Sequence, residues 1–398
     1  MSQTHDSNLQ ITRLTGAQRI RQRPGVVFGD DNIDGAKRCV LDLLQIFATE
    51  AQLGHCKHLQ VLQNGEALTI SADDRGIFLG HENGDDTVWK NIFDDFFCPP
   101  THAPAEAGYS FPLQASSHHF LYGDPILPEQ HLYADDCGCF ELYCTQCASR
   151  FMEVVSVRSG IQKTLCFDRG RNQGGILTAS SDKANGTSFR FALDPEVFTD
   201  TVLPAEFFLE TLERFAMLLP GFSCSYTNGE ICRSFCYLGG IADYVRQTPA
   251  DPVFYNRLQA KGRERYNRGE YEAVVEIALT PAPGRGSTLC LHNFRQLPYG
   301  GSHLQALEER LCHAFNLCFH LEKELTIPEL SRHLSIVLVS HCTPHCTLWE
   351  NGTRLSIQNR VIADMTHDAA AQALEDFVYQ NKAYLQPLVE RISAERID

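Results

Sequence analysis

The sequence predicts an α+β protein of two domains, and three observations support this fold class. The chain has 398 residues, whereas a single hydrophobic core rarely grows beyond about 250–300 residues. Segments with strand character alternate with helical segments along both halves, as in layered folds that pack helices on sheets. A helical segment at 205–218 is stopped by Pro220-Gly221, so we place the boundary between domains 1–220 and 221–398 there.

In the first half, apolar residues recur with a helical period between 34 and 53, which predicts a helix. Strands are expected at 59–63 and 67–71, because Asn64-Gly65 is a strong signal for a hairpin turn. Residues 79–135 carry many turn formers and little periodicity, so we expect an irregular insert there. The remaining expected elements are a helix at 139–151, strands at 152–158, 162–168 and 187–192, and the helix at 205–218.

The second half repeats this mixture of strands and helices. Strands are expected at 223–226, 232–237, 272–279, 288–293 and 334–340, and helices at 240–247, 302–318 and 367–394. Their alternation favours a layered α/β arrangement for this half as well.

The composition is that of a soluble globular protein, with 43% hydrophobic and 21% charged residues. The sequence contains no long apolar run and no N-terminal signal pattern, so we expect no membrane contact and a cytoplasmic location with reduced cysteines. The net charge of −15 disfavours sequence-independent binding of nucleic acid, which requires a basic surface. A local basic groove at Arg19, Arg21 and Arg23 remains open, and DNA contact is expected only weakly or through a partner.

Several short motifs occur along the chain in a distinctive order. They are Leu53-Gly54-His55-Cys56, Asp73-Asp74-Arg75-Gly76-Ile77, Asn185-Gly186-Thr187, Tyr237-Leu238-Gly239-Gly240-Ile241, and His292-Asn293-Phe294 followed by Gly300-Gly301-Ser302-His303-Leu304. This order resembles the ATPase and transducer region of the B subunit of DNA gyrase and topoisomerase IV, in the GHKL superfamily. The resemblance implies a GHKL (Bergerat-type) α/β sandwich followed by an α/β transducer domain of ribosomal S5 type. No segment resembling a Toprim domain follows, so we expect no DNA cleavage by this polypeptide alone.

The resemblance also implies ATP and Mg²⁺ as cofactors. In the family, a glutamate polarises the attacking water and an asparagine four residues later binds magnesium, a spacing that places both on one helical face. Counting back from Gly54-His55-Cys56, these positions hold Asp42 and Ile46. Asp42 is the candidate catalytic carboxylate, although it is one methylene shorter than glutamate. Ile46 cannot bind magnesium, which requires oxygen ligands, so we expect a core residue there and assign no metal ligand.

The family reads adenine with an aspartate that begins a D-x-G-x-G turn. Aligned without a gap, that position is Ala72, and with one glycine deleted it is Asp73. A plain acidic turn remains an equal alternative. The candidate cofactor-binding residues implied by the resemblance are Asp73, Gly76, Ile77, Gly138 and Thr187.

The phosphate side of the site departs further from the family. The glycine-rich lid of the family corresponds to Tyr133–Cys139, which keeps only Gly138 and places two aspartates where phosphate charge would lie. Arg354 stands near the position of the transducer lysine and is a candidate phosphate contact, with a solvated loop residue as the alternative. His5 stands where the family's N-terminal arm carries a tyrosine that crosses a homodimer.

A zinc site is a competing interpretation of the clustered cysteines. The candidate ligands are Cys137, Cys139, Cys144, Cys147, His118, His119 and His131. Only Cys144-Thr145-Gln146-Cys147 has the paired spacing typical of zinc sites, and it lies within a predicted helix. We therefore favour chance placement and predict no metal site.

Three functions remain open from the sequence. The first is a divergent ATPase/transducer region of a type IIA DNA topoisomerase B subunit, with weak or no ATP hydrolysis, that binds itself or a topoisomerase subunit. The second is an active ATP-hydrolysing DNA topoisomerase subunit that uses Asp42, Asp73 and Arg354. The third is a nucleotide-sensing or interaction protein that binds without hydrolysis. Ile46 and the acidic lid disfavour the second, so we predict the first.

Overall fold

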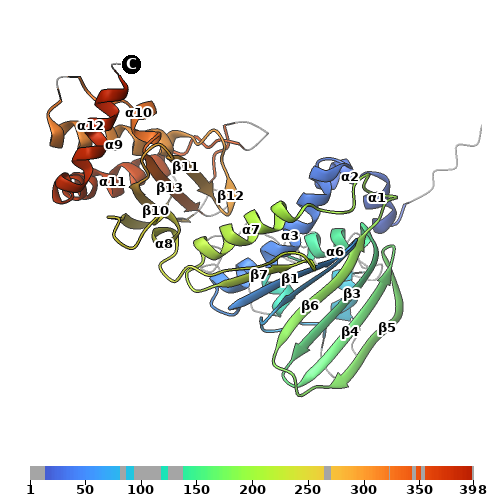
Figure 1. Cartoon of the computed structure of the whole chain (residues 1–398). Helices are drawn as coiled ribbons and strands as arrows, with labels where there is room; N and C mark the ends of the chain where they lie inside the picture. Colours follow the sequence, from blue (N-terminus) through green and yellow to red (C-terminus); the bar gives the residue numbers. More distant parts are fainter. Residues whose placement is uncertain are drawn as a thin grey trace, which may run out of the picture.

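The strands in the described part of the chain form two separate sheets in two parts of the molecule (Figure 1). The first sheet has eight strands in the order β5-β4-β3-β6-β2-β1-β7-β8, and the second has five in the order β12-β11-β13-β10-β9. This arrangement of mixed sheets with packed helices confirms the predicted α+β class. The computed structural model describes residues 14–80, 87–93, 118–123, 138–263, 270–321, 323–342, 347–350 and 355–396.

The first sheet is centred on the hairpin of β1 (His58–Asn64) and β2 (Ala67–Ala72). The two strands pair antiparallel around the turn that Asn64-Gly65 predicts. Gly65 has a φ of 60°, a backbone conformation that glycine adopts without strain. Side chains along β1 alternate between exposed and buried, so the sheet buries one face in the core. The other strands before residue 200 are β3 (Ser149–Arg158), β4 (Ile161–Asp168), β5 (Arg171–Ser180) and β6 (Gly186–Leu193).

Helices α3, α6 and α7 lie together on one side of the first sheet (Figure 1). The longest of them, α3 (Ile33–Gln52), begins where the side chain of Asn32 accepts a hydrogen bond from the N–H of Asp34. Its apolar side chains join those of the sheet in one core, for example where Phe47 lies 5.5 Å from Phe189 between ring centres. The other helices are α1 (Gly16–Gln22), α2 (Pro24–Phe28), α4 (Thr87–Phe93), α5 (His118–Tyr122), α6 (Cys139–Cys147) and α7 (Ala205–Leu218).

The first sheet continues beyond the expected domain boundary at Pro220-Gly221. Strand β7 (Ser223–Thr227) pairs in parallel with β1, and β8 (Cys232–Phe235) pairs antiparallel with β7. By sheet membership, the first unit therefore includes two strands that we expected in the second domain. The sequence did not reveal this, because a parallel pairing between distant segments leaves no local turn signal.

Both faces of the second sheet are covered by helices. On one face, α9 (Ser302–Phe319) and α11 (Arg360–Gln380) share a core with the sheet, and on the other α8 (Ile241–Val245) packs against it. The strand β13 (Leu334–Cys342) is buried at every position, as a strand with two covered faces must be. The remaining elements are β9 (Phe254–Arg263), β10 (Glu270–Pro281), β11 (Ser287–His292), β12 (Arg295–Gln296), α10 (Ile327–Ser331) and α12 (Lys382–Glu395).

The single helix expected at 367–394 is divided into α11 and α12. Asn381 lies at the junction, where its side-chain amide donates to the carbonyl of Phe377 and so competes with continued helical bonding. Strand β5 was not expected, because Gly174-Gly175 and its polar neighbours show no apolar alternation. Among the helices of the described ranges, none combines the length and apolar character needed to cross a membrane.

Candidate functional site

Helix α3 carries the positions at which the family resemblance places water activation and magnesium binding. Ile46 has no exposed surface and belongs to the apolar core, as expected. Asp42 is 8% exposed, and its carboxylate lies 2.7 Å from the Nε of Arg38, one turn earlier on the helix. These residues do not fit magnesium, because a hydrocarbon side chain stands where an oxygen ligand is needed. The described residues also contain no group of three or more His, Cys, Asp or Glu side chains placed to hold a metal ion.

The turn after β2 gives its two aspartates different roles. The Oδ1 of Asp73 accepts hydrogen bonds from the backbone N–H groups of Lys57, at 2.8 Å, and His58, at 2.7 Å. Partial burial acts to raise the pKa of Asp73, but these backbone hydrogen bonds lower it below its ordinary value. Asp73 therefore fixes the start of β1. The aspartate that meets Thr187 is its neighbour Asp74, which was not among the residues expected at the site.

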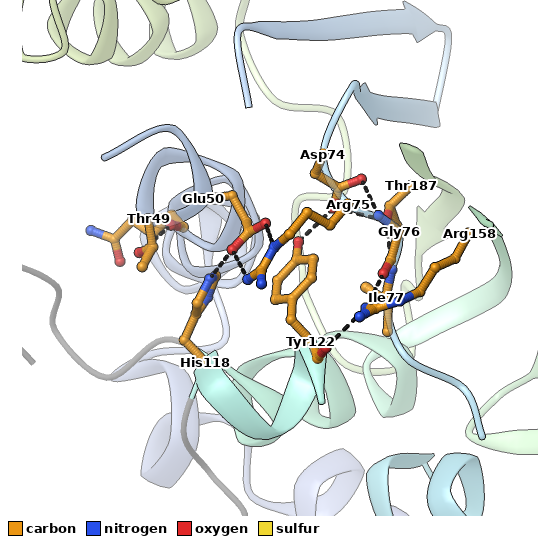
Figure 2. Close-up of polar contacts among 11 residues, drawn as sticks. Thr49, Glu50, Asp74, Arg75, Gly76, Ile77, His118, Tyr122, Arg158 and Thr187 are labelled. Atoms are coloured by element: carbon orange, nitrogen blue, oxygen red, sulfur yellow. Dashed lines mark hydrogen bonds and ion pairs between the residues drawn. The ribbon is translucent and has the colours of Figure 1, made fainter. Parts of the chain in front are cut away.

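Asp74 is the centre of a buried cluster that includes three of the expected cofactor-binding residues (Figure 2). Thr187 donates its hydroxyl to the Oδ2 of Asp74 at 2.9 Å and accepts the N–H of Ile77 at 3.2 Å. The N–H of Gly76 donates to the Oδ1 of Asp74 at 3.2 Å. Gly76 has a φ of 76°, and a Cβ there would lie 2.3 Å from the carbonyl oxygen of Val157, so the turn requires glycine.

Glu50 lies one helical turn after Ile46 and is held by two basic side chains. Arg75 donates through Nε and Nη2 to the two carboxylate oxygens of Glu50, at 3.0 and 2.8 Å, in a fork geometry. The Nε2 of His118 lies 2.8 Å from the Oε1 of Glu50. Burial acts to raise the pKa of Glu50, but the hydrogen bonds from His118 and Arg75 outweigh it and lower the pKa. The carboxylate is thus kept ionised although it has no exposed surface.

Helix α5 completes the cluster by placing Tyr122 against Asp74 (Figure 2). The phenol donates to the Oδ2 of Asp74 at 2.5 Å, and both side chains are buried. The guanidinium carbon of Arg75 lies 5.0 Å from the ring centre of Tyr122, within the range of a cation–π contact. The rings of Tyr122 and His118 lie 4.8 Å apart between their centres. The same tyrosine therefore links the Asp74 cluster to the Glu50 cluster.

Burial sets the protonation of these groups. It raises the pKa of Asp74 to about 6, even though hydrogen bonds from Tyr122 and Thr187 act to lower it. Burial, together with the nearby charges of Asp74 and Glu50, raises the pKa of Tyr122. The phenol therefore keeps its proton near neutral pH and serves as a hydrogen-bond donor. The Oδ2 of Asp74 can accept a hydrogen bond from a group that lies opposite it, and in this structure the phenol of Tyr122 is that group.

Of the residues expected on the phosphate side, Gly138 is described and forms the N-cap of α6. Its N–H donates to the Oε2 of Glu141 at 2.7 Å. The carboxylate of Glu141 thus accepts the hydrogen bond of an N–H group at the N-terminus of α6. Free N–H groups at a helix N-terminus otherwise favour an anion such as phosphate. Arg354, the lid segment up to Cys137, and His5 in the N-terminal arm lie outside the described residues.

The candidate zinc ligands do not converge in the described part of the chain. Cys144 and Cys147 are buried within α6, and His118 is engaged with Glu50. Burial raises the pKa of the Cys144 thiol, which opposes the thiolate form that binds zinc. Cys137 and His131, together with the side chain of His119, lie outside the described residues. All described cysteines are free thiols.

The arginines considered as a basic groove include one with a structural role. Arg21 in α1 donates to the Oδ2 of Asp194 at 2.8 Å and to the Oε2 of Glu196 at 2.9 Å. It also donates to the carbonyl of Cys147 at 3.1 Å. These contacts anchor α1 to the first unit, so the Arg21 charge is neutralised within the chain.

The chain is similar to known proteins both in sequence and in fold. No family model matches the sequence. The B subunit of DNA gyrase from Streptococcus pneumoniae serotype 4 is 23% identical over 410 residues, which cover 98% of this chain and 58% of that protein. The crystal structure of the 43K ATPase domain of Thermus thermophilus gyrase B, in complex with an aminocoumarin, matches with a TM-score of 0.65 and 18% identity over 96% of this chain and 95% of that one. The chain is therefore similar to B subunits of DNA gyrase over nearly its whole length.

Other relatives extend the same result. The B subunit of DNA topoisomerase 4 from Enterococcus faecalis is 22% identical over 412 residues, which cover 97% of this chain and 54% of that protein. The B subunit of DNA gyrase from Myxococcus xanthus matches in structure with a TM-score of 0.65 and 15% identity, over 92% of this chain and 97% of that one. The chain thus spans little more than half the length of these curated relatives, and it shares its fold with the solved ATPase domain of gyrase B.

Sequence reasoning missed several residues of the cluster. Asp74 was passed over because the alignment of the shortened turn favoured its neighbour Asp73. Glu50 could have been found, since it lies four residues after Ile46 on the same side of α3. His118 and Tyr122 carried no signal, because they lie in an insert whose position in space depends on tertiary contacts.

Proposed function

We propose that this chain is a divergent counterpart of the ATPase and transducer region of a type IIA topoisomerase B subunit, with weak or no ATP hydrolysis. The observation that carries the proposal is the complete burial of Ile46 in the apolar core. The family binds magnesium at that position through an oxygen ligand, which isoleucine cannot supply.

The phosphate side supports the same proposal. The N–H of Gly138 is already paired with the carboxylate of Glu141. Asp42 is paired with Arg38 at 2.7 Å, so its charge is partly neutralised where a water-activating base would be needed. Hydrolysis requires metal, base and phosphate contacts together, and each of them is altered here.

A second candidate function is nucleotide sensing without hydrolysis. It is favoured by the cluster of Asp74, Thr187, Gly76 and Ile77, which keeps the polar groups of a purine-reading turn. In this alternative the ligand is an adenine nucleotide and the output is a change in binding to a partner. Partners implied by the relatives are a second copy of the chain and a topoisomerase subunit, with DNA contacted only through that subunit.

The proposal is tested by measuring phosphate release and binding on the same preparation. The full chain is incubated with ATP and magnesium, and calorimetric titration with a non-hydrolysable ATP analogue is run beside it. We expect no magnesium-dependent phosphate release above the level of a protein-free blank. Binding of the analogue without release would favour the sensing function, and absence of both would favour an interaction protein.

The matched control is Asp42→Asn, which removes the candidate base and leaves the helix intact. Release that persists unchanged in Asp42→Asn would come from a contaminating enzyme and would not count against the proposal. Release that falls in Asp42→Asn would show that the chain itself hydrolyses ATP. That result would overturn the proposal in favour of an active enzyme.

A further inference from the structure

Helix α5 is attached to the candidate purine site through backbone and side-chain hydrogen bonds. The carbonyl of Leu121 accepts the N–H of Phe78 at 2.9 Å, and the carbonyl of Tyr122 accepts from Arg158 at 2.9 Å. Two side chains of α5, those of His118 and Tyr122, reach the two buried carboxylates, at 2.8 and 2.5 Å. Such a short helix is not stable by itself, so these contacts hold it in place.

Three donors of the chain itself already bond to the carboxylate of Asp74. A carboxylate offers about four lone-pair positions. Asp74 receives the N–H of Gly76 on one oxygen and the hydroxyls of Thr187 and Tyr122 on the other. The first two donors belong to the turn and to β6, and they would remain in place if a ligand bound. Of these three donors, Tyr122 alone comes from a separate helix that could be exchanged for a ligand.

We propose that α5 is an internal plug of the purine site, in which the phenol of Tyr122 takes the acceptor that a purine amino group would use. Because Asp74 is 2% exposed, a purine could reach it only after this helix moves away. A purine nucleoside and α5 therefore exclude each other. This inference rests on the proposed likeness of the site to a nucleotide site, and it adds an autoinhibitory contact to that site.

The test is calorimetric titration of the full chain with adenosine in the absence of magnesium. Adenosine carries no phosphate, so the altered metal and phosphate positions do not affect the result. Tyr122→Phe keeps the ring and removes the hydrogen bond to a charged acceptor, so displacement of α5 becomes easier and we expect about tenfold tighter binding. Tyr122→Ala removes the ring as well and should bind adenosine more tightly still.

Tyr226→Phe is the matched control. The phenol of Tyr226 is also fully buried and donates at 2.5 Å, to the Oε1 of Gln63, but it lies outside the Asp74 cluster. We expect its adenosine affinity to equal that of the unmodified chain. Tyr122→Phe is close to isosteric, so it decides the question even if Tyr122→Ala does not fold.

The plug is overturned if folded Tyr122→Phe binds adenosine no better than Tyr226→Phe, whether both bind or neither does. That outcome would leave the proposed lack of hydrolysis untouched, because phosphate release is measured separately. Conversely, phosphate release from the unmodified chain that falls in Asp42→Asn would refute the proposed function, while the adenosine titrations would still decide the role of α5.

Discussion

Two positions on α3, one helical turn apart, have the same burial and opposite chemistry. Ile46 and Glu50 both have no exposed surface. Ile46 is surrounded by apolar side chains of the core, whereas Glu50 is held ionised by Arg75 and His118. Under the proposed function, the two halves of the site therefore differ: the position assigned to magnesium lies in hydrophobic core, and the residues around the proposed purine turn form a paired polar cluster.

The difference has a physical basis. A buried carboxylate is tolerated only when charged or hydrogen-bonding partners compensate its lost hydration. Removing one member of such a cluster is therefore costly, because it leaves the other members buried without a partner. An isolated metal ligand can be replaced by a hydrocarbon at little cost, because the hydrocarbon packs against its neighbours. The polar half can therefore persist in a protein that no longer hydrolyses ATP.

The largest expected effect is the loss of stability in Glu50→Gln. The substitution keeps the shape of the side chain but leaves the Arg75 guanidinium without its carboxylate. Breaking a buried ion pair by removing one partner costs about 3–5 kcal/mol in the free energy of unfolding. Urea denaturation of the purified chain measures this difference.

The control for Glu50→Gln is Glu66→Gln, which removes the carboxylate of a surface pair. Glu66 lies 3.0 Å from Arg150, with both side chains more than a third exposed, at 51% and 42%. Exposed pairs of this kind contribute less than about 1 kcal/mol. Equal losses in the two variants would show that the Glu50 cluster is not the compensated buried network that the comparison requires.

A smaller effect is expected in the pH dependence of stability through Asp74. Its pKa is raised in the folded protein from 3.8 to about 6, so the native state binds the extra proton between these values. Stability from this group is complete below the lower value and is lost as pH rises through the upper one. A shift of about two units corresponds to about 3 kcal/mol. Asp74→Asn should remove this decline, as measured by urea denaturation from about pH 4 to 7.

Asp73→Asn provides the opposite sign as a control. The pKa of Asp73 is lowered in the folded state, so its contribution is present at neutral pH and is lost as pH falls. The decline with rising pH should therefore persist in Asp73→Asn. If Asp73→Asn rather than Asp74→Asn abolished this decline, Asp73 and not Asp74 would be the aspartate of raised pKa, contrary to the structure.

The sequence predicted much of the fold because the relevant signals are local. The helical period of α3 and the turn at Asn64-Gly65 gave α3, β1 and β2 nearly at their observed bounds. The place of β7 beside β1 was not predictable, since it depends on pairing between distant segments. By the same reasoning, the sequence indicated the burial of Ile46 from its residue type.

The sequence predicted only those residues of the candidate cluster whose positions are set by the backbone. Gly76, Ile77 and Thr187 converge because a tight turn and a strand register place them together. The place of Asp74 in the cluster was beyond sequence reasoning, because the two alignments considered put Ala72 or Asp73 at the position of the aspartate. Tyr122 was also beyond it, since no local pattern indicates that a short helix from an insert packs on a distant turn.

The smallest expected effect is on catalysis, in Ile46→Asn. This substitution restores the residue type that the family uses for magnesium, yet we expect no magnesium-dependent phosphate release. The new amide would be enclosed by apolar side chains and would cost about 1–3 kcal/mol of stability for an unpaired polar group. The candidate base on the same face, Asp42, is already paired with Arg38. Measurable hydrolysis by Ile46→Asn would show that this one residue alone prevents hydrolysis, and the proposed difference between the two halves of the site would have to be abandoned.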